Sequence, residues 1–215
     1  MRISYSQVDN FLSCPRKWKE APRVETRQMR VGSLIHRALE GHIKNGCIME
    51  DALKHAILNE DISEQMDAMS LLRNFDLPKG DIIGLEKRFE FPLKEHSVSG
   101  VVDRIESYDF DIVISDYKSG GWLPTINDVK RNLQPAIYMI SEPQATHFRY
   151  YFLKFNKSLE LERDNVWLDE VKEILYDTAC KMKIVREMHI GEAPATPNKF
   201  CKWCSLYSRC LEELT

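Results

Sequence analysis

The sequence predicts a mixed α/β fold in which a central sheet is flanked by helices. Segments rich in β-branched and aromatic residues follow one another between residues 82 and 118. Amphipathic helical patterns precede them, and another strand-like segment and a long helical pattern follow. With 215 residues, 43% of them apolar and 29% charged, the chain is long enough to bury a sizeable core. We see no internal repeat and no apolar stretch of membrane-spanning length.

The elements are expected in a definite order. Helices are predicted near 6–19 and 32–44, followed by two polar amphipathic helices between 50 and 75 that end at Leu77-Pro78-Lys79-Gly80. Strands are predicted at 82–91, 97–107 and 112–118, then a helix near 127–140 and strands at 147–156 and 159–163. A long helix at 169–189 leads into a cysteine-containing tail. We expect one domain with a helical part at 1–80, a core at 81–190 and a tail at 191–215.

Two acidic residues lie on neighbouring predicted strands. Residues i and i+2 of a strand face the same side, so Asp116 and Lys118 should project together while Tyr117 projects away. Counting back from the turn at 107–111 puts Asp103 nearly opposite Asp116. Paired carboxylates repel each other unless a cation neutralises them, and oxygen ligands suit Mg²⁺ or Mn²⁺. Lys118 would then orient a water or stabilise phosphoryl charge, as in a metal-dependent phosphodiesterase. Taken alone, the triplet fits a surface salt-bridge ladder better.

Four of the six cysteines are spaced like metal ligands. They are Cys14 near the N-terminus and, in a C-x2-C-x5-C pattern, Cys201, Cys204 and Cys210. Such spacing fits either a four-thiolate zinc site or an iron-sulfur cluster. A disulfide framework is the competing interpretation, but without a signal-like segment we expect a reducing, intracellular, cytoplasmic setting. Cys47 and Cys180 have no paired neighbour and are expected to be ordinary core or surface thiols.

Basic residues are concentrated near the N-terminus, although the net charge is -3. Residues 1–40 carry twice as many Lys and Arg as Asp and Glu. In this part, Arg16 and Lys17 are candidates for phosphate contacts, and Trp18 for stacking on an unpaired base. A solvated helical face explains the same pattern. Trp122, in a glycine-containing loop, is a second candidate for stacking on a base. Residues 41–215 are acidic overall, which suits a protein that binds DNA in a local channel.

Together these residues resemble the RecB-like nucleases of the PD-(D/E)xK superfamily. The resemblance is to the iron-sulfur branch that includes CRISPR-associated exonucleases and the AddB nuclease domain, and it runs almost end to end. Its motifs are Ser4-Tyr5-Ser6 leading to Cys14-Pro15, Gly32-Ser33-Leu34-Ile35-His36, Gly100-Val101-Val102-Asp103, Asp116-Tyr117-Lys118-Ser119-Gly120, Gln134 with Tyr138, and the terminal cysteines. It implies a restriction-endonuclease-like central mixed sheet flanked by helices, with the N- and C-terminal segments joined at a 4Fe-4S cluster.

The resemblance also implies a role for each motif residue. The positions that match metal ligands are His36, Asp103, Asp116 and the backbone carbonyl of Tyr117, with Glu86 at an acidic position that often joins the site. Lys118 matches the catalytic lysine, and Gln134 and Tyr138 match a Q-x3-Y motif that contacts the DNA backbone near the scissile phosphate. The cluster ligands are matched by Cys14, Cys201, Cys204 and Cys210.

Each of these residues also has a simpler explanation. His36 flanks an apolar helical stripe and would ordinarily be a packed histidine. Glu86 and Glu90 share a predicted strand face, and either would suit solvent. The Q-x3-Y pair would be a polar rim residue and a core aromatic. Pro135 requires that its helix begins near Asn132, so that the proline falls in the first turn.

The function implied is that of a divalent-metal-dependent DNA exonuclease, a hydrolase of phosphodiester bonds in single-stranded ends. It would serve DNA recombination, repair or CRISPR adaptation, with Mg²⁺ or Mn²⁺ and a 4Fe-4S cluster as cofactors and zinc as the lesser possibility. No Walker-type sequence occurs, so unwinding would need a partner such as a helicase, and a CRISPR integrase is another possible partner. The alternative is a catalytically silent DNA-binding or assembly module, against which the intact Asp103, Asp116 and Lys118 argue.

Overall fold

The chain folds into two compact units. The computed structural model describes residues 1–46, 48–57, 61–73, 75 and 79–212, so the predictions for Cys47 and for Leu77-Pro78 lie outside the described residues. The first unit consists of Met1–Val24, Phe89–Gly100 and Asp164–Thr215, and the second of Glu25–Arg88 and Val101–Arg163. Strands β2 (Asp81–Leu93) and β3 (His96–Tyr108) contribute residues to both. None of the described helices has the length and apolar character needed to cross a bilayer.

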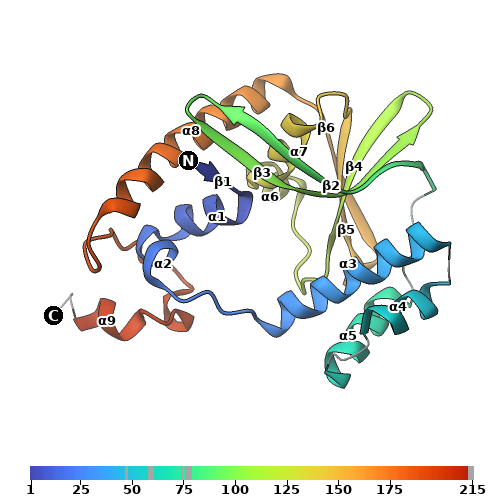
Figure 1. Cartoon of the computed structure of the whole chain (residues 1–215), viewed down its shortest axis with the longest axis horizontal. Coiled ribbons are helices and arrows are strands. Elements are labelled where there is room, and N and C mark those ends of the chain that lie inside the picture. The colour runs from blue at the N-terminus through green and yellow to red at the C-terminus, as the bar shows by residue number, and fades with distance from the viewer. Residues whose placement is uncertain (47, 58–60, 74, 76–78, 213–215) are drawn as a thin grey trace. The chain divides into compact units, whose positions relative to one another are not determined.

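The second unit is built on a mixed sheet. β4 (Asp111–Lys118) runs antiparallel to β3, β5 (His147–Phe152) runs parallel to β4, and β6 (Lys157–Glu162) runs antiparallel to β5. The parallel pair requires a crossover, which α6 (Ile126–Arg131) and α7 (Leu133–Ser141) provide (Figure 1). The predicted mixed sheet is therefore confirmed.

Helices pack on both faces of this sheet. α3 (Arg27–Asn45) lies beside α4 (Met49–Ile57) and α5 (Ile62–Leu72) (Figure 1). Their buried residues, among them Leu34 and Leu53, form one apolar cluster with Tyr117 of β4. On the other face, the ring of Tyr138 in α7 lies 6.1 Å from that of Phe148 in β5. The flanking helices expected from the sequence are thus present.

Two helices expected to be continuous are each divided in two. The pattern at 6–19 forms α1 (Tyr5–Ser13) and α2 (Pro15–Glu20), because Cys14 is extended, with φ of -167°. A residue before proline is disfavoured in the helical region, which explains the break. The pattern at 127–140 divides at Asn132, whose side chain accepts a hydrogen bond from the Gln134 N–H and so caps α7.

The first unit contains one strand that the sequence did not predict. β1 (Arg2–Ile3) pairs in parallel with the start of β3, and two residues are too few to show a periodicity. The long helix α8 (Asn165–Glu187) begins earlier than expected because Asp164 accepts hydrogen bonds from the N–H groups of Val166 and Trp167. α8 packs against α1 and α2. The tail adds a 3₁₀ turn, η2 (Cys201–Trp203), and α9 (Tyr207–Glu212).

Candidate active site

Asp103 and Asp116 form a pair of buried carboxylates on adjacent strands. In the register of β3 and β4, Arg104 lies opposite Ser115, and one further step puts Asp103 opposite Asp116, as predicted. The two residues are 8% and 3% exposed. The N–H of Tyr117 donates to Asp103 Oδ2 at 3.2 Å, which fixes the orientation of that carboxylate. The Tyr117 side chain points away into the apolar cluster with α3, again as predicted.

His36 and Glu86 approach the same carboxylate pair from other elements. His36 Nδ1 in α3 lies 3.4 Å from Asp103 Oδ1 and 3.9 Å from Glu86 Oε1 in β2. One donor atom from each of the three residues lies within 4.8 Å of the other two. Glu90, which the sequence places on the same strand face as Glu86, instead pairs with Arg2 at 3.8 Å. The structure therefore brings Glu86 to the site.

Glu86 reaches this position through an unusual backbone conformation. Its φ is 47°, in the left-handed region that a residue with a side chain rarely adopts. Such a conformation costs of order 1–3 kcal/mol and persists where surrounding contacts impose it. It also interrupts the regular alternation of β2, so the prediction that Glu86 and Glu90 share a face does not apply. Strand periodicity alone could not have separated the two residues.

Lys118 and Asp116 face each other, as their i, i+2 spacing predicts. Lys118 Nζ lies 2.7 Å from Asp116 Oδ2 and donates to Gln134 Oε1 at 2.8 Å. The lysine side chain is 35% exposed, whereas that of Asp116 is 4% exposed. The ammonium thus sits at the boundary between the buried carboxylate and solvent, where a charged substrate can reach it.

Gln134 is the centre of the hydrogen-bond network at this site. Its Oε1 accepts from Lys118 Nζ and from the Tyr150 hydroxyl, the latter at 3.0 Å. Its Nε2 donates to Asp116 Oδ1 and to the Tyr138 oxygen, each at 2.9 Å. Both hydrogens and both lone pairs of the amide are therefore used within the protein. Because Gln134 is 7% exposed, its contacts are with the catalytic candidates themselves.

The start of α7 explains how Gln134 is placed. The helix begins at Leu133, after the Asn132 cap, so Pro135 falls in the first turn, where a missing N–H costs no helical hydrogen bond. Gln134 and Tyr138 then lie one turn apart on the face directed at Asp116. The condition that the sequence set for Pro135 is met.

Tyr150 is a site residue that the sequence reasoning missed. It lies in β5 directly beside Asp116, with its ring centroid 4.9 Å from Lys118 Nζ. The signal was present: Tyr150 lies between Phe148 and Phe152 on one strand face, where a single hydroxyl on an otherwise apolar face needs a buried partner.

The charges at the site shift the pKa values of its members. Burial raises the pKa of Asp116 to about 6; Lys118 opposes this shift and Asp103 adds to it. Burial alone would lower the pKa of His36, but the hydrogen bond and charge of Asp103, with Asp116 and Glu86, raise it to about 9. Burial and the Asp103 charge raise the pKa of Glu86. Burial is thus the main cause of the raised pKa of both carboxyl groups, and neighbouring positive charges oppose it.

This donor set fits a small divalent cation. Its carboxylate oxygens are the ligands that Mg²⁺ and Mn²⁺ prefer in proteins, and the His36 imidazole is a nitrogen donor beside them. Among the described atoms, Asp116 Oδ2 is buried without a hydrogen-bond partner, although Lys118 Nζ lies close to it. A buried carboxylate oxygen with spare lone pairs is a group that a cation stabilises.

The four predicted cysteine ligands line one cavity in the first unit. Cys14, Cys201, Cys204 and Cys210 surround a space of about 360 Å³, together with residues of the 195–200 loop. Cys14 Sγ accepts from the N–H groups of Lys17 and Thr196 at 3.5 and 3.4 Å, and Cys201 Sγ from that of Asn198 at 3.2 Å. Backbone donors directed at sulfur are typical of thiolates that hold a metal centre.

The predicted DNA contacts have different surroundings. Arg16 is 8% exposed; its guanidinium donates to the carbonyls of Gly191 and Ala193, both at 2.9 Å, and to Cys210 Sγ at 3.8 Å. The predicted phosphate contact of Arg16 is therefore corrected: the residue anchors the tail beside the cysteine cavity. Lys17 is exposed, and Trp18 packs edge-on against Phe11.

Trp122 is exposed, whereas two arginines of α3 are engaged in ion pairs. Trp122 is 66% exposed, and so available for stacking. Of the basic residues in α3, Arg27 pairs with Asp67 at 2.8 Å and Arg30 with Glu64 at 2.6 Å. These pairs explain part of the N-terminal concentration of basic residues as structural ion pairs within the second unit.

Comparisons with known proteins bear on the fold and the family of the chain. A crystal structure named "Putative exonuclease", from Eubacterium rectale, superimposes with a TM-score of 0.60 at 13% identity, over 96% of this chain and 86% of that chain. A second crystal structure, named SSO0001, gives a TM-score of 0.38 at 16% identity over 98% of this chain and 95% of that one. No curated protein sequence matches. The model of the PD-(D/E)XK nuclease superfamily matches residues 2–211, so the chain belongs to that superfamily.

Proposed function

We propose that the protein is a divalent-metal-dependent deoxyribonuclease that acts as an exonuclease on single-stranded DNA ends. The observation that carries the proposal is the buried pair of Asp103 and Asp116, with the Lys118 ammonium 2.7 Å from Asp116 Oδ2. Membership of a nuclease superfamily agrees with this site. The whole chain acts as one nuclease domain in this proposal, in DNA recombination, repair or CRISPR adaptation.

Each residue of the site has a separate role in this proposal. His36, Asp103, Asp116 and the Tyr117 carbonyl would hold Mg²⁺ or Mn²⁺, with Glu86 as a further carboxylate. The bound cation supplies Lewis-acid stabilisation of phosphate charge. Lys118, at the solvent boundary, stabilises the negative charge that develops on the transferred phosphoryl group or orients the attacking water. Tyr138 and Gln134 hold Asp116 and Lys118 in place.

The cysteine cavity would hold a 4Fe-4S cluster as a structural centre. A volume of about 360 Å³ is many times the roughly 30 Å³ that one water occupies, and so has room for more than a single ion. Four thiolates are the standard ligand set of such a cluster. Cys14 follows α1 and the other three ligands lie in the tail, so the centre joins the N- and C-terminal segments. Zinc is the competing occupant. A cluster here is typical of the RecB-like iron-sulfur type, to which we assign the chain.

Exposed groups would contact the DNA. Lys17 supplies a phosphate contact, and Trp122 offers a stacking platform for an unpaired base, with Trp18 as a second aromatic. The strand would be delivered by a protein partner such as a helicase, and a CRISPR integrase is a second candidate. We expect the protein to work in the reducing interior of the cell, which suits free thiols at Cys14, Cys201, Cys204 and Cys210.

Degradation of end-labelled single-stranded DNA tests the proposal. We expect the labelled strand to shorten in Mn²⁺ or Mg²⁺ and to stay intact in EDTA, because the carboxylates cannot bind phosphate without a cation. The same strand closed into a circle separates exonuclease from endonuclease action and should survive. Retention of the DNA without any cleavage, in either metal, would contradict the proposal and favour a binding or assembly module.

Metal binding should also be visible without DNA. A cation at 100 times its dissociation constant stabilises the folded state by about 2.7 kcal/mol, so Mn²⁺ should raise the melting temperature by roughly 5–10 °C. Asp103→Asn should abolish this shift, since Asp103 lies nearest to His36. Asp109→Asn, at the exposed turn between β3 and β4, is the matched control and should shift like the parent. Equal shifts in both variants would exclude Asp103 as a ligand. The measurement is thermal unfolding followed by circular dichroism.

Tyr150→Phe tests whether the network positions the catalytic groups. The change removes the hydroxyl that donates to Gln134 Oε1, a hydrogen bond worth about 1 kcal/mol. We expect kcat to fall about fivefold while KM for DNA stays unchanged. Tyr151→Phe is the control, because its hydroxyl accepts from Arg149 on the opposite sheet face. A raised KM with normal kcat would instead make Tyr150 a DNA contact.

A further inference from the structure

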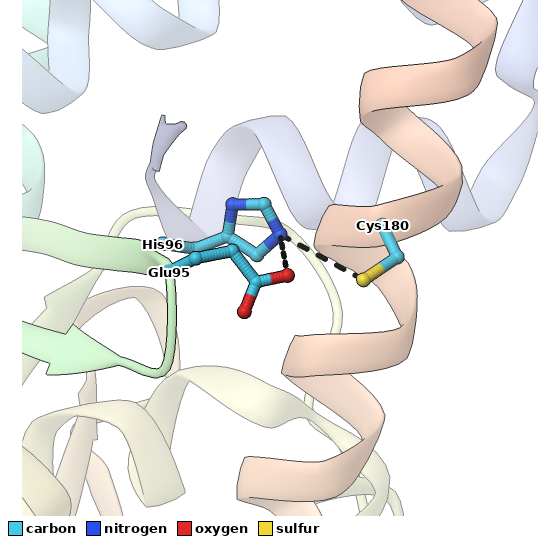
Figure 2. A group of neighbouring side chains, drawn as sticks. All are labelled: Glu95, His96 and Cys180. Atoms are coloured by element: carbon cyan, nitrogen blue, oxygen red, sulfur yellow. Dashed lines mark hydrogen bonds and ion pairs between the residues drawn. The ribbon is translucent and has the colours of Figure 1, made fainter.

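A second group of metal-ligating side chains lies in the first unit. Glu95 is in the turn between β2 and β3, His96 begins β3, and Cys180 is in α8, so the three come from separate parts of the chain (Figure 2). One donor atom of each lies within 4.8 Å of the other two. Unlike the candidate active site, this group contains a thiol. Its chemistry therefore differs from that of the Asp103 and Asp116 pair.

Both neighbours of His96 converge on the same ring nitrogen. His96 Nε2 lies 3.5 Å from Glu95 Oε1 and 3.7 Å from Cys180 Sγ (Figure 2). In a cysteine–histidine–acid relay the acid would contact the opposite ring nitrogen, to orient the imidazole. Here Nδ1 is instead engaged by the nitrogen of Met1 at 3.0 Å. Three donors directed at one point are the arrangement of a metal site rather than of a nucleophilic relay.

The separations match the edges of a zinc coordination tetrahedron. With Zn–N and Zn–O bonds of about 2.0 Å and a Zn–S bond of about 2.3 Å, tetrahedral angles give about 3.3 Å between N and O and about 3.5 Å between N and S. The observed 3.5 and 3.7 Å are within 0.2 Å of these values. The 3.5 Å separation from Glu95 is long for a hydrogen bond to the ring nitrogen, whereas 3.7 Å is an ordinary hydrogen-bond length to sulfur.

Other contacts hold the turn against α8. Lys94 Nζ lies 3.7 Å above the ring of Tyr176 and 3.4 Å from Glu173. The Tyr176 hydroxyl donates to Glu95 Oε1 at 3.2 Å. Lys94 itself has a left-handed φ of 53°, which sets the course of the turn. The site is therefore preorganised, and the Glu95 side chain, 57% exposed, leaves a path to solvent for the ion.

We propose that Glu95, His96 and Cys180 bind one zinc ion that ties the β2–β3 turn to α8. A thiolate, an imidazole and a carboxylate together suit Zn²⁺ rather than Mg²⁺, which takes oxygen ligands. A water completes the fourth position. The site is independent of the proposed nuclease reaction, because none of its residues belongs to the candidate active site.

Zinc binding by the full-length chain tests this site. Protein stripped with EDTA and exchanged into excess Mg²⁺, which occupies the oxygen-ligand site, is titrated with Zn²⁺ against a chromogenic chelator. We expect Cys180→Ser to bind one equivalent fewer than the parent, and Glu95→Gln to bind that equivalent at least about tenfold more weakly. The same difference of one equivalent should appear when Cys180→Ser is added to Cys201→Ser, which isolates the site from the cysteine cavity.

Cobalt gives an independent readout. Co²⁺ in place of zinc should produce a thiolate charge-transfer band that is reduced in Cys180→Ser and unchanged in Cys201→Ser once the cavity contribution is subtracted. Equal zinc content in the parent, Cys180→Ser and Glu95→Gln would overturn the proposal. Should Cys180→Ser fail to fold, Glu95→Gln decides, because a glutamine oxygen at this exposed position can still accept from the Tyr176 hydroxyl.

Discussion

Replacing Lys118 with alanine is expected to lower the rate of DNA cleavage by about 10³-fold or more. A positioned cation that stabilises developing phosphoryl charge, or that orients water, contributes on this scale. The loss should fall on kcat, since the proposed DNA contacts at Lys17 and Trp122 are untouched. Lys157→Ala, an exposed lysine of β6, is the matched control and should cleave at the parental rate. The measurement is single-turnover cleavage of end-labelled single-stranded DNA in Mn²⁺.

The same variant has a second signature in the absence of DNA. Lys118 lies beside the buried Asp116 and opposes the rise in the pKa of that carboxyl. Without the ammonium, the fold should unfold at lower temperature in EDTA and recover part of the loss on adding Mg²⁺, which restores positive charge near Asp116. Unchanged cleavage by Lys118→Ala would exclude the lysine from catalysis, whatever the stability result.

Cys201→Ser is expected to abolish the absorbance at about 400 nm of the freshly purified protein. It should also lower the melting temperature by roughly 5–10 °C. A serine oxygen is a poor replacement for thiolate, and the loss of the centre leaves the cavity of about 360 Å³ without its content. Cys180→Ser is the control for the absorbance alone, because Cys180 lies in the same unit but outside the cavity, and the visible absorbance should persist. Its melting temperature is not compared, since Cys180 is a ligand of the proposed zinc site.

The result also decides between the two occupants of the cavity. A colourless parent whose zinc content falls in Cys201→Ser would return the cysteines to zinc, while leaving the nuclease proposal intact. A parent and variant of equal colour and equal stability would mean that Cys201 holds neither centre.

Much of the fold was accessible from the sequence because its signals are local. The hairpin that carries Asp103 and Asp116 follows from alternation and a short turn, and the register confirms it. The break at Cys14 was also local, since the proline after it was visible, but helix periodicity on both sides concealed it. The two-residue β1 gave no pattern to detect.

What escaped prediction depends on contacts between distant segments. The sequence predicts a phosphate contact for Arg16. In the fold its guanidinium instead donates to two carbonyl groups of the tail, 175 and 177 residues further along the chain. Glu86 was separated from Glu90 by a positive φ that no strand pattern encodes. Cys180 is expected from the sequence to be an ordinary thiol because it has no paired cysteine nearby, and its contact with His96, 84 residues away, leaves no pattern in the sequence.

The fully used amide of Gln134 bears on which ions the active site would accept. An amide with four fixed partners resists rotation, and through Nε2 it holds Asp116 while Tyr117 N–H holds Asp103. Carboxylates restrained in this way cannot move apart easily. Ca²⁺ needs ligands at 2.3–2.6 Å and Mg²⁺ at 2.0–2.1 Å, so we expect the restrained carboxylates to favour the smaller cation. The hydrogen bonds of one buried amide would thus set which ionic radius the site accepts.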